Sequence, residues 1–123
     1  SHTLLYVDDD EALISVMSRM LARQGYVVES MDNPQEAIDR LREPQRRPDV
    51  VILDYNMPQM SGISLARAIR TLDARLPIIL TSGHVTDELR DQARAAGIDH
   101  VIEKPDTSRE LAGLIAGLAG RHA

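Results

Sequence analysis

The residues of this sequence best suited to chemistry are acidic side chains, a hydroxyl and a lysine, each placed just after a short apolar segment. They are Asp8, Asp9 and Asp10 after residues 3–7, Asp54 after 49–53, Ser82 after 77–80 and Lys104 after 98–102. Carboxylates that converge repel one another unless a cation lies between them, and oxygen ligands without Cys or His favour Mg²⁺ or Mn²⁺. A carboxylate in such a site can also become an aspartyl phosphate. The set therefore indicates phosphoryl transfer beside a divalent cation.

Within this set, the residue types suggest separate roles. Asp54 is the candidate nucleophile, and Asp8 and Asp9 are candidate metal ligands. Lys104 offers a positive charge and Ser82 a hydroxyl donor, and both suit the negative charge that develops on transferring phosphoryl oxygens.

Taken one at a time, the same residues have structural explanations. An Asp after a strand is often a helix N-cap or a turn former, which is the simplest interpretation of Asp10 and an alternative for Asp8 and Asp9. Lys104 alone would be a surface lysine, and Ser82 alone a turn hydroxyl before a glycine. Their joint placement at strand ends favours the functional interpretation.

The elements that must position these residues are alternating strands and helices. The five apolar, β-branched segments are 3–7, 26–30, 49–53, 77–80 and 98–102, and the helical stretches are 11–24, one beginning near 34, 62–72, 86–96 and one beginning near 107. Continuous apolar strands indicate a parallel sheet covered on both faces, of which the doubly wound form is the commonest. Ligands of such sheets bind at the carboxyl ends of the strands, where the candidate residues fall.

Several local signals mark the expected helix ends. Gly25 suits the position after a helix, and Pro34 suits a first helical turn. Thr107 with Glu110 has the capping-box spacing. Gly62 fits either a helix start or a loop, and the sequence leaves both alternatives open.

Composition restricts the class of protein. A chain of 123 residues with 43% hydrophobic and 27% charged residues suits one globular domain. It lacks an apolar run long enough for a membrane span and the pattern of a signal peptide, so we expect a cytoplasmic setting. Absence of Cys excludes thiol catalysis and disulfides. A net charge of −5, scattered basic residues and no Phe or Trp argue against direct nucleic-acid binding.

With these residues and motifs in place, the sequence resembles the receiver domains of two-component response regulators. The resemblance is carried by YVDDDE, VVILDYNMPQMSG, LTSG and EKPDTSRELAGLI, which together extend over nearly the whole chain. It implies one receiver domain over residues 1–123, with a (βα)5 flavodoxin-like fold and strand order 2-1-3-4-5. It also implies that a histidine kinase or a histidine phosphotransfer protein donates the phosphoryl group from a phosphohistidine.

The resemblance assigns a metal site. Asp54 matches the phosphoacceptor and a metal ligand, Asp9 the direct ligand, and Asp8 its neighbour that acts largely through water. Asn56 matches the residue that gives its backbone carbonyl to the metal. The expected ion is Mg²⁺, with Mn²⁺ as the alternative.

The resemblance also assigns the groups around the phosphoryl oxygens. Ser82 matches the hydroxyl that follows the phosphoryl group, and Lys104 matches the lysine that pairs with it. The ungapped spacing to Lys104 favours Ser82 over Thr81, which stays the alternative. His84 falls where family members tune the lifetime of the acyl phosphate, although an exposed loop histidine without such a role fits equally well.

Two positions depart from the family pattern. Val101 stands where Tyr or Phe is common, which puts an aromatic switch in doubt, and Asp106 stands where Phe is frequent.

We expect a phosphorylation switch with at most self-phosphorylation and slow autodephosphorylation. Its output surface comprises residues 86–96, 98–102 and the helix after 107, through which a receiver homodimer is a further expectation.

Other functions fit less well. A phosphohydrolase of similar inventory usually carries a second Asp where Asn56 stands, and also a cap domain. A receiver-like scaffold without phosphorylation would not need the full acidic set. Nucleotide binding would need a glycine-rich loop after residues 3–7, where three acids stand instead.

Overall fold

The apolar segments of the chain form a parallel sheet. Its strands are β1 (Thr3–Val7), β2 (Val27–Met31), β3 (Val50–Asp54), β4 (Ile78–Ser82) and β5 (His100–Glu103). Their order is β2-β1-β3-β4-β5, which confirms the expected topology. β1 has the expected bounds, and the bounds of the other strands differ from the expected segments by one or two residues. As a result Asp54 and Ser82 are the last residues of their strands, where the sheet itself fixes their backbones.

The structure is a computed structural model of the chain. It describes the backbone of residues 2–104 and 107–122, and the side chains of residues 2–104 and 111–118. The predicted capping-box side chains of Thr107 and Glu110, and the departure at Asp106, lie outside the described residues.

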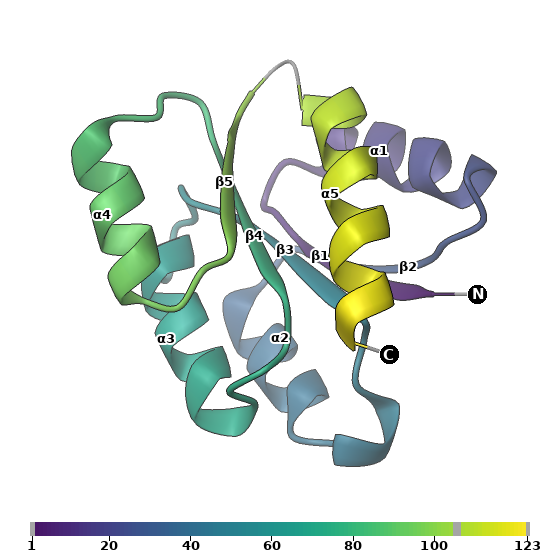
Figure 1. Cartoon of the computed structure of the whole chain (residues 1–123), viewed down its shortest axis with the longest axis horizontal. Helices are drawn as coiled ribbons and strands as arrows, with labels where there is room; N and C mark the ends of the chain where they lie inside the picture. The colour runs from purple at the N-terminus through teal and green to yellow at the C-terminus, as the bar shows by residue number, and fades with distance from the viewer. Residues whose placement is uncertain (1, 105–106, 123) are drawn as a thin grey trace.

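Helices cover both faces of the sheet (Figure 1). They are α1 (Glu11–Arg23), α2 (Pro34–Leu41), α3 (Gly62–Leu72), α4 (Asp87–Ala95) and α5 (Thr107–His122), with a short 3₁₀ helix, η1 (Pro44–Arg46), before β3. One apolar cluster joins β1 and β3 to α1 and α5, and another joins the opposite sides of the strands to α2, α3 and α4. The fold is therefore the doubly wound α/β arrangement predicted from the alternation of segments.

The central strands are the most deeply enclosed part of the sheet. Every residue of β3 and of β4 is buried. Burying a large aliphatic side chain contributes about 1.5–3 kcal/mol to folding, so these two strands are firmly held between both helix layers. Asp54 and Ser82 thus lie at the ends of the two strands whose residues are all buried.

Local capping explains where the helices begin. The side chain of Asp10 accepts a hydrogen bond from the backbone N–H of Leu13 at 3.1 Å, so the capping interpretation of Asp10 is confirmed. Asn33 caps α2 in the same way, accepting from the N–H of Gln35 at 2.8 Å. Gly25 follows α1 with φ of 96°, a conformation that glycine adopts without strain.

Gly62 is the first residue of α3, which decides between the two alternatives left open by the sequence. Its N–H donates to the carbonyl oxygen of Tyr55 at 2.9 Å. A Cβ at this position would lie 2.5 Å from the carbonyl oxygen of Asp54 and 2.6 Å from Cδ1 of Leu80. Only a residue without a side chain lets α3 begin this close to the end of β3.

Replacing Gly62 by Ala is therefore expected to lower the free energy of unfolding by about 2 kcal/mol, because the new methyl group displaces the backbone that carries Asp54. Gly113→Ala in α5 is the matched control. A Cβ there would meet nothing within 4 Å, so a helix-favouring gain of up to about 1 kcal/mol is expected. Urea denaturation measures both, and a Gly62→Ala protein as stable as the wild type would contradict the close packing.

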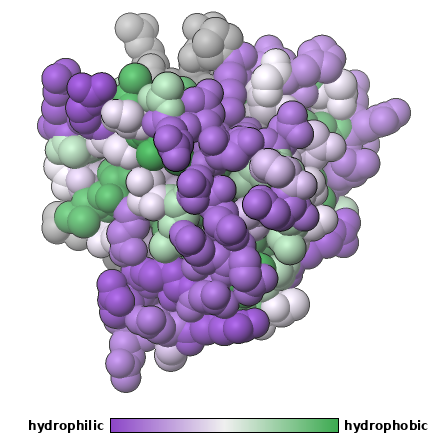
Figure 2. All heavy atoms as spheres, turned by 180° about the vertical axis from the view of Figure 1, so that it is seen from behind, coloured by the Kyte–Doolittle hydropathy of each residue, from purple (hydrophilic) through white to green (hydrophobic). Residues whose placement is uncertain are grey.

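No helix in the described part of the chain has the length and apolarity needed to cross a bilayer. Figure 2 shows one side of the molecule, on which hydrophilic residues predominate and apolar residues form small separate groups.

Candidate functional site

The carboxyl ends of the strands bring the predicted acidic residues together. Asp8 and Asp9 follow β1, and Asp54 ends β3. Each of the three offers a carboxylate oxygen, and these oxygens all lie within 4.8 Å of one another. The structure thus makes a single acidic cluster of Asp8, Asp9 and Asp54.

Backbone hydrogen bonds continue the sheet past the strand ends and hold these residues in place. The N–H of Asp8 donates to the carbonyl oxygen of Met31 at 3.1 Å. The N–H of Tyr55 donates to the carbonyl oxygen of Thr81 at 2.8 Å, and the N–H of Lys104 donates to the carbonyl oxygen of Ser82 at 2.8 Å. The side chains therefore project from an ordered ladder rather than from free loops.

Lys104 faces two of the carboxylates. Its Nζ lies 3.0 Å from Oδ1 of Asp54 and 3.4 Å from Oδ2 of Asp8. Burial lowers the pKa of Lys104, but the hydrogen bond to Asp54 and the charges of Asp8 and Asp54 outweigh it and raise that pKa above its ordinary value. The ammonium group is therefore charged at neutral pH. Its contact with Asp8 was not predicted from the sequence.

Buried polar side chains are concentrated at this edge of the sheet. Within residues 2–104 and 111–118, the polar or charged residues that are buried are Asp8, Asp54, Thr81 and Ser82, each at most 5% exposed. Burying such groups is costly unless they are paired. A concentration of this kind in one place is typical of a functional site rather than of a structural core.

Asp8 is the most deeply buried carboxylate of the cluster. Its burial, together with the charge of Asp54, raises the pKa of Asp8 above its ordinary value. A hydrogen bond from the N–H of Asp10 to Oδ1 of Asp8, at 2.9 Å, and the charge of Lys104 oppose that rise without cancelling it.

Tyr6 is a site neighbour that the sequence did not reveal. Burial, the charges of the nearby carboxylates Asp8, Asp54 and Asp10, and a side-chain hydrogen bond with Asp8 raise the pKa of Tyr6 far above its ordinary value, so its hydroxyl keeps its proton. The available signal was the strand period of two, which puts Tyr6 on the same side of β1 as Asp8.

The donor set fits a hard divalent cation. Three carboxylates against the single ammonium group of Lys104 leave two negative charges, which one doubly charged ion would balance. All the ligand atoms are oxygens, as Mg²⁺ requires. Asn56 lies exposed in the loop after β3, and the contribution of its carbonyl stays a prediction.

The two hydroxyl candidates differ in their partners. Thr81 is completely buried, and its Oγ1 donates to the carbonyl oxygen of Leu53 at 3.4 Å. Ser82 Oγ donates to the carbonyl oxygen of His84 at 3.1 Å and accepts from the N–H of His84 at 3.4 Å. Ser82 therefore bonds the loop after β4, whereas Thr81 bonds the buried central strand, and this difference favours Ser82 as the responsive group.

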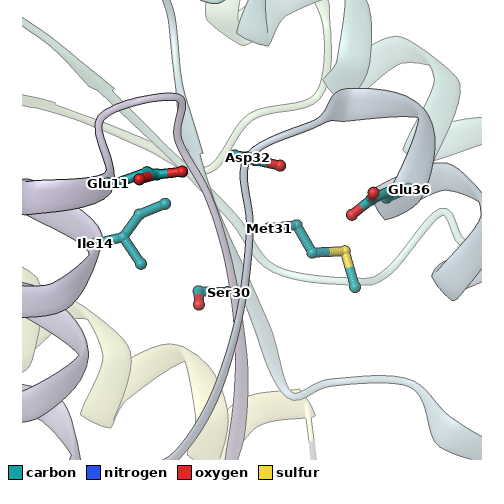
Figure 3. Close-up of a pocket in the computed structure, with 6 residues that line it drawn as sticks. All are labelled: Glu11, Ile14, Ser30, Met31, Asp32 and Glu36. Atoms are coloured by element: carbon teal, nitrogen blue, oxygen red, sulfur yellow. The ribbon is translucent and has the colours of Figure 1, made fainter.

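A separate cleft lies beside the acidic cluster, between the start of α1 and the start of α2 (Figure 3). Glu11 and Ile14 extend from α1 on one side of it, Glu36 lies on the opposite side, and Met31 and Asp32 lie between them. Its three carboxylates add negative potential next to the cluster, which raises the local concentration of cations.

Comparison with known proteins agrees with this geometry. The sequence model of the response regulator receiver domain matches residues 4–116. The chain belongs to this family. The receiver domain is a phosphoacceptor of two-component signalling and acts as a signalling switch rather than as a metabolic enzyme.

The relatives of this receiver domain include longer proteins. The response regulator MprA of Mycolicibacterium vanbaalenii is 33% identical over 118 residues, which are 96% of this chain and 50% of that protein. The chain therefore spans about half the length of the curated relatives it matches.

Solved receiver domains share the fold. A CheY-like receiver domain protein of Methanospirillum hungatei JF-1 is 25% identical, with a TM-score of 0.90 over 98% of this chain and 95% of that one. The receiver domain of the sensor histidine kinase PA1611 of Pseudomonas aeruginosa, solved with a magnesium ion coordinated in its active site cleft, is 25% identical, with a TM-score of 0.87 over 98% of each chain.

The departure at strand β5 is real in the structure. Val101 lies in β5, half-buried, and packs against the apolar cluster that includes α3 and α4. His100 beside it is also half-buried. An aliphatic side chain thus fills the place where Tyr or Phe is common among the receiver domains that the sequence resembles.

Proposed function

We propose that Asp54 accepts a phosphoryl group from the phosphohistidine of a histidine kinase or a histidine phosphotransfer protein. A carboxylate oxygen of Asp54 attacks phosphorus, the bond between phosphorus and the imidazole nitrogen breaks, and the imidazole leaves with that electron pair. The observation that carries this proposal is the position of Asp54, which is nearly buried, 3.0 Å from Lys104 and clustered with Asp8 and Asp9.

The metal site of this reaction would be formed by Asp8, Asp9, Asp54 and the backbone carbonyl of Asn56. Mg²⁺ is the proposed ion, with Mn²⁺ as the alternative, and the related Pseudomonas aeruginosa domain supports Mg²⁺. When bound, the ion supplies positive charge to the phosphoryl oxygens.

The side chains of the protein have distinct tasks. Lys104, already within hydrogen-bonding distance of Asp54, pairs with a phosphoryl oxygen after transfer. Ser82 donates its hydroxyl to another oxygen. The new group itself carries a charge of about −2 at neutral pH. It is a stronger partner for Lys104 than the Asp54 carboxylate, and a stronger acceptor for Ser82 than the carbonyl of His84.

The wider consequences follow from the same switch. We assign residues 1–123 to one receiver domain acting in the cytoplasm, with slow autodephosphorylation whose rate Asn56 and His84 tune. The proposed output surface is formed by α4, β5 and α5, and a homodimer through it is the expected assembly. Sedimentation of the unmodified and phosphorylated forms tests that assembly.

The proposal is tested by incubating the protein with acetyl phosphate and measuring its intact mass. We expect the mass of one phosphoryl group to be added in Mg²⁺ and not after chelation by EDTA. A protein that gains no mass in Mg²⁺, while retaining its fold by circular dichroism, would instead be a scaffold that binds partners without phosphorylation.

The choice of Ser82 over Thr81 gives a separate prediction. Ser82→Ala should slow phosphorylation by acetyl phosphate on the order of tenfold, because a hydrogen bond to the charged group is lost in the transition state. Thr81→Ala should lower stability and leave the phosphorylation rate within about twofold of the wild type, because the Thr81 hydroxyl donates to the carbonyl oxygen of Leu53. Rates come from the time course of the intact mass, and the reverse order of effects would assign the role to Thr81.

A further inference from the structure

The loop that joins β4 to α4 has two ties to the site. This β4–α4 loop comprises residues 83–86. The first tie is the pair of hydrogen bonds between the Ser82 hydroxyl and the backbone of His84. The second tie was not predicted from the sequence: the N–H of Val85 donates to Oε1 of Glu103 at 2.9 Å. The loop is therefore held by a hydroxyl of β4 and by a carboxylate of β5.

Glu103 is well placed to sense the site. It is the last residue of β5, it lies opposite Ser82 in the register of the two strands, and it directly precedes Lys104. A bond from a backbone N–H to a carboxylate is charge-assisted, hence stronger than a neutral one. One residue thus connects the β4–α4 loop to the strand that carries the site lysine.

We propose that Glu103 is a positioning residue that holds the β4–α4 loop in its resting arrangement and thereby sets how readily Ser82 turns toward a phosphorylated Asp54. This inference rests on the proposed function of Asp54.

The Ser82 hydroxyl has a single proton to donate. That proton is donated to His84 in the resting structure, so it cannot be donated to a phosphoryl oxygen until the first tie breaks. The bond between Val85 and Glu103 then still opposes movement of the loop. An interaction made only in the resting state lowers the population of the alternative state, and its removal raises that population.

The space around the loop permits the movement. Gly83 is exposed, and a Cβ added to it would meet nothing within 4 Å. His84 is likewise exposed. The start of the loop is therefore open, whereas Val85 packs against the apolar cluster of α3 and α4. At the open end, the hydrogen bonds of Ser82 and Glu103 hold the backbone of the loop.

The test compares Glu103→Ala with Glu103→Gln, because a glutamine oxygen can still accept from Val85 whereas alanine cannot. Glu88→Ala, which removes an exposed charge from the first turn of α4, controls for the change in charge near the loop. Two quantities are measured in the full chain: the hydrogen-exchange rate of the Val85 amide in the unphosphorylated protein, and the rate of phosphorylation by acetyl phosphate in Mg²⁺.

We expect Glu103→Ala to increase both the exchange rate of Val85 and the phosphorylation rate by about fivefold, as for loss of one ordinary hydrogen bond. Glu88→Ala should stay within about twofold of the wild type. Glu103→Gln should lie between the wild type and Glu103→Ala, because its neutral oxygen accepts a weaker hydrogen bond than a carboxylate does. The beryllofluoride-bound wild type should also lose protection at Val85.

Unchanged protection of Val85 in Glu103→Ala, or a glutamine variant that behaves like the alanine variant, would overturn the inference. So would faster exchange without faster phosphorylation, because the tie would then be structural only. These outcomes are distinct from failure of the proposed function, in which the wild-type protein itself would not be phosphorylated.

Discussion

Asp54→Asn is expected to abolish phosphorylation of this protein. Asparagine has nearly the same shape and keeps one oxygen that can accept from Lys104, but its amide is not a nucleophile that can form an acyl phosphate. After incubation with acetyl phosphate in Mg²⁺, the intact mass of the variant should be unchanged, whereas the wild type gains one phosphoryl group. We therefore expect a complete loss of phosphorylation rather than a slower reaction.

Asp91→Asn is the matched control for this substitution. Asp91 is exposed on α4, where its ion pair with Arg94 lies in solvent, so its loss should leave phosphorylation unchanged. Asp54→Asn must also be shown to fold, which urea denaturation of the variant establishes. A folded Asp54→Asn protein that still gains the phosphoryl mass would place the acceptor at another residue.

Asp8→Asn is expected to have opposite effects on stability in the absence and presence of Mg²⁺. In EDTA the variant should be more stable than the wild type, because burial and the charge of Asp54 disfavour the charged form of Asp8. Asparagine keeps the acceptor for the N–H of Asp10. At a Mg²⁺ concentration about a hundredfold above Kd, the wild type gains about 2.7 kcal/mol and the variant, lacking a ligand, gains much less.

The effect of this substitution on stability in EDTA should depend on pH, and the direction of the pKa shift of Asp8 fixes the sign of that dependence. Because the pKa of Asp8 is raised in the metal-free folded state, Asp8 binds more protons in the folded than in the unfolded chain between the ordinary value of 3.8 and the raised value. The contribution of Asp8 to stability is therefore lost as pH rises through this window, and Asp8→Asn lacks that loss. The advantage of the variant in EDTA should grow with pH and vanish below the ordinary value.

Urea denaturation in EDTA and in Mg²⁺, repeated across this pH range, measures the reversal. Asp39→Asn on the exposed surface of α2 is the control and should change stability by less than about 0.5 kcal/mol in either buffer. If Asp8→Asn were destabilised in EDTA, the charge of Asp8 would not be unfavourable in the metal-free protein. If Mg²⁺ stabilised the variant as much as the wild type, Asp8 would not be a metal ligand.

The acidic cluster could be predicted from the sequence because it depends on a general property of parallel sheets. The strand segments were recognisable from their apolar runs, and the carboxyl ends of such strands share one edge. Asp8 and Asp54 had to meet there whatever the details of the loops. Asp10 was likewise predictable as a cap, since capping depends on residues three positions apart.

Other features depend on contacts that no local pattern contains. The start of α3 at Gly62 follows from its close approach to the carbonyl of Asp54. The end of β4 at Ser82, rather than earlier, follows from its pairing with Glu103, because Thr and Ser alone are as typical of a loop as of a strand. The bond between Val85 and Glu103 joins residues 18 positions apart and is set by the path of the loop.

The most direct test of the account locates the phosphoryl group itself. Borohydride reduces an aspartyl phosphate to homoserine, so peptide sequencing after treatment of the acetyl-phosphate-labelled protein identifies the residue that was modified. We predict homoserine at position 54 in Mg²⁺ and none after chelation by EDTA. Homoserine at Asp8, at Asp9 or at an acidic residue outside the cluster would contradict the assignment of Asp54 as the acceptor.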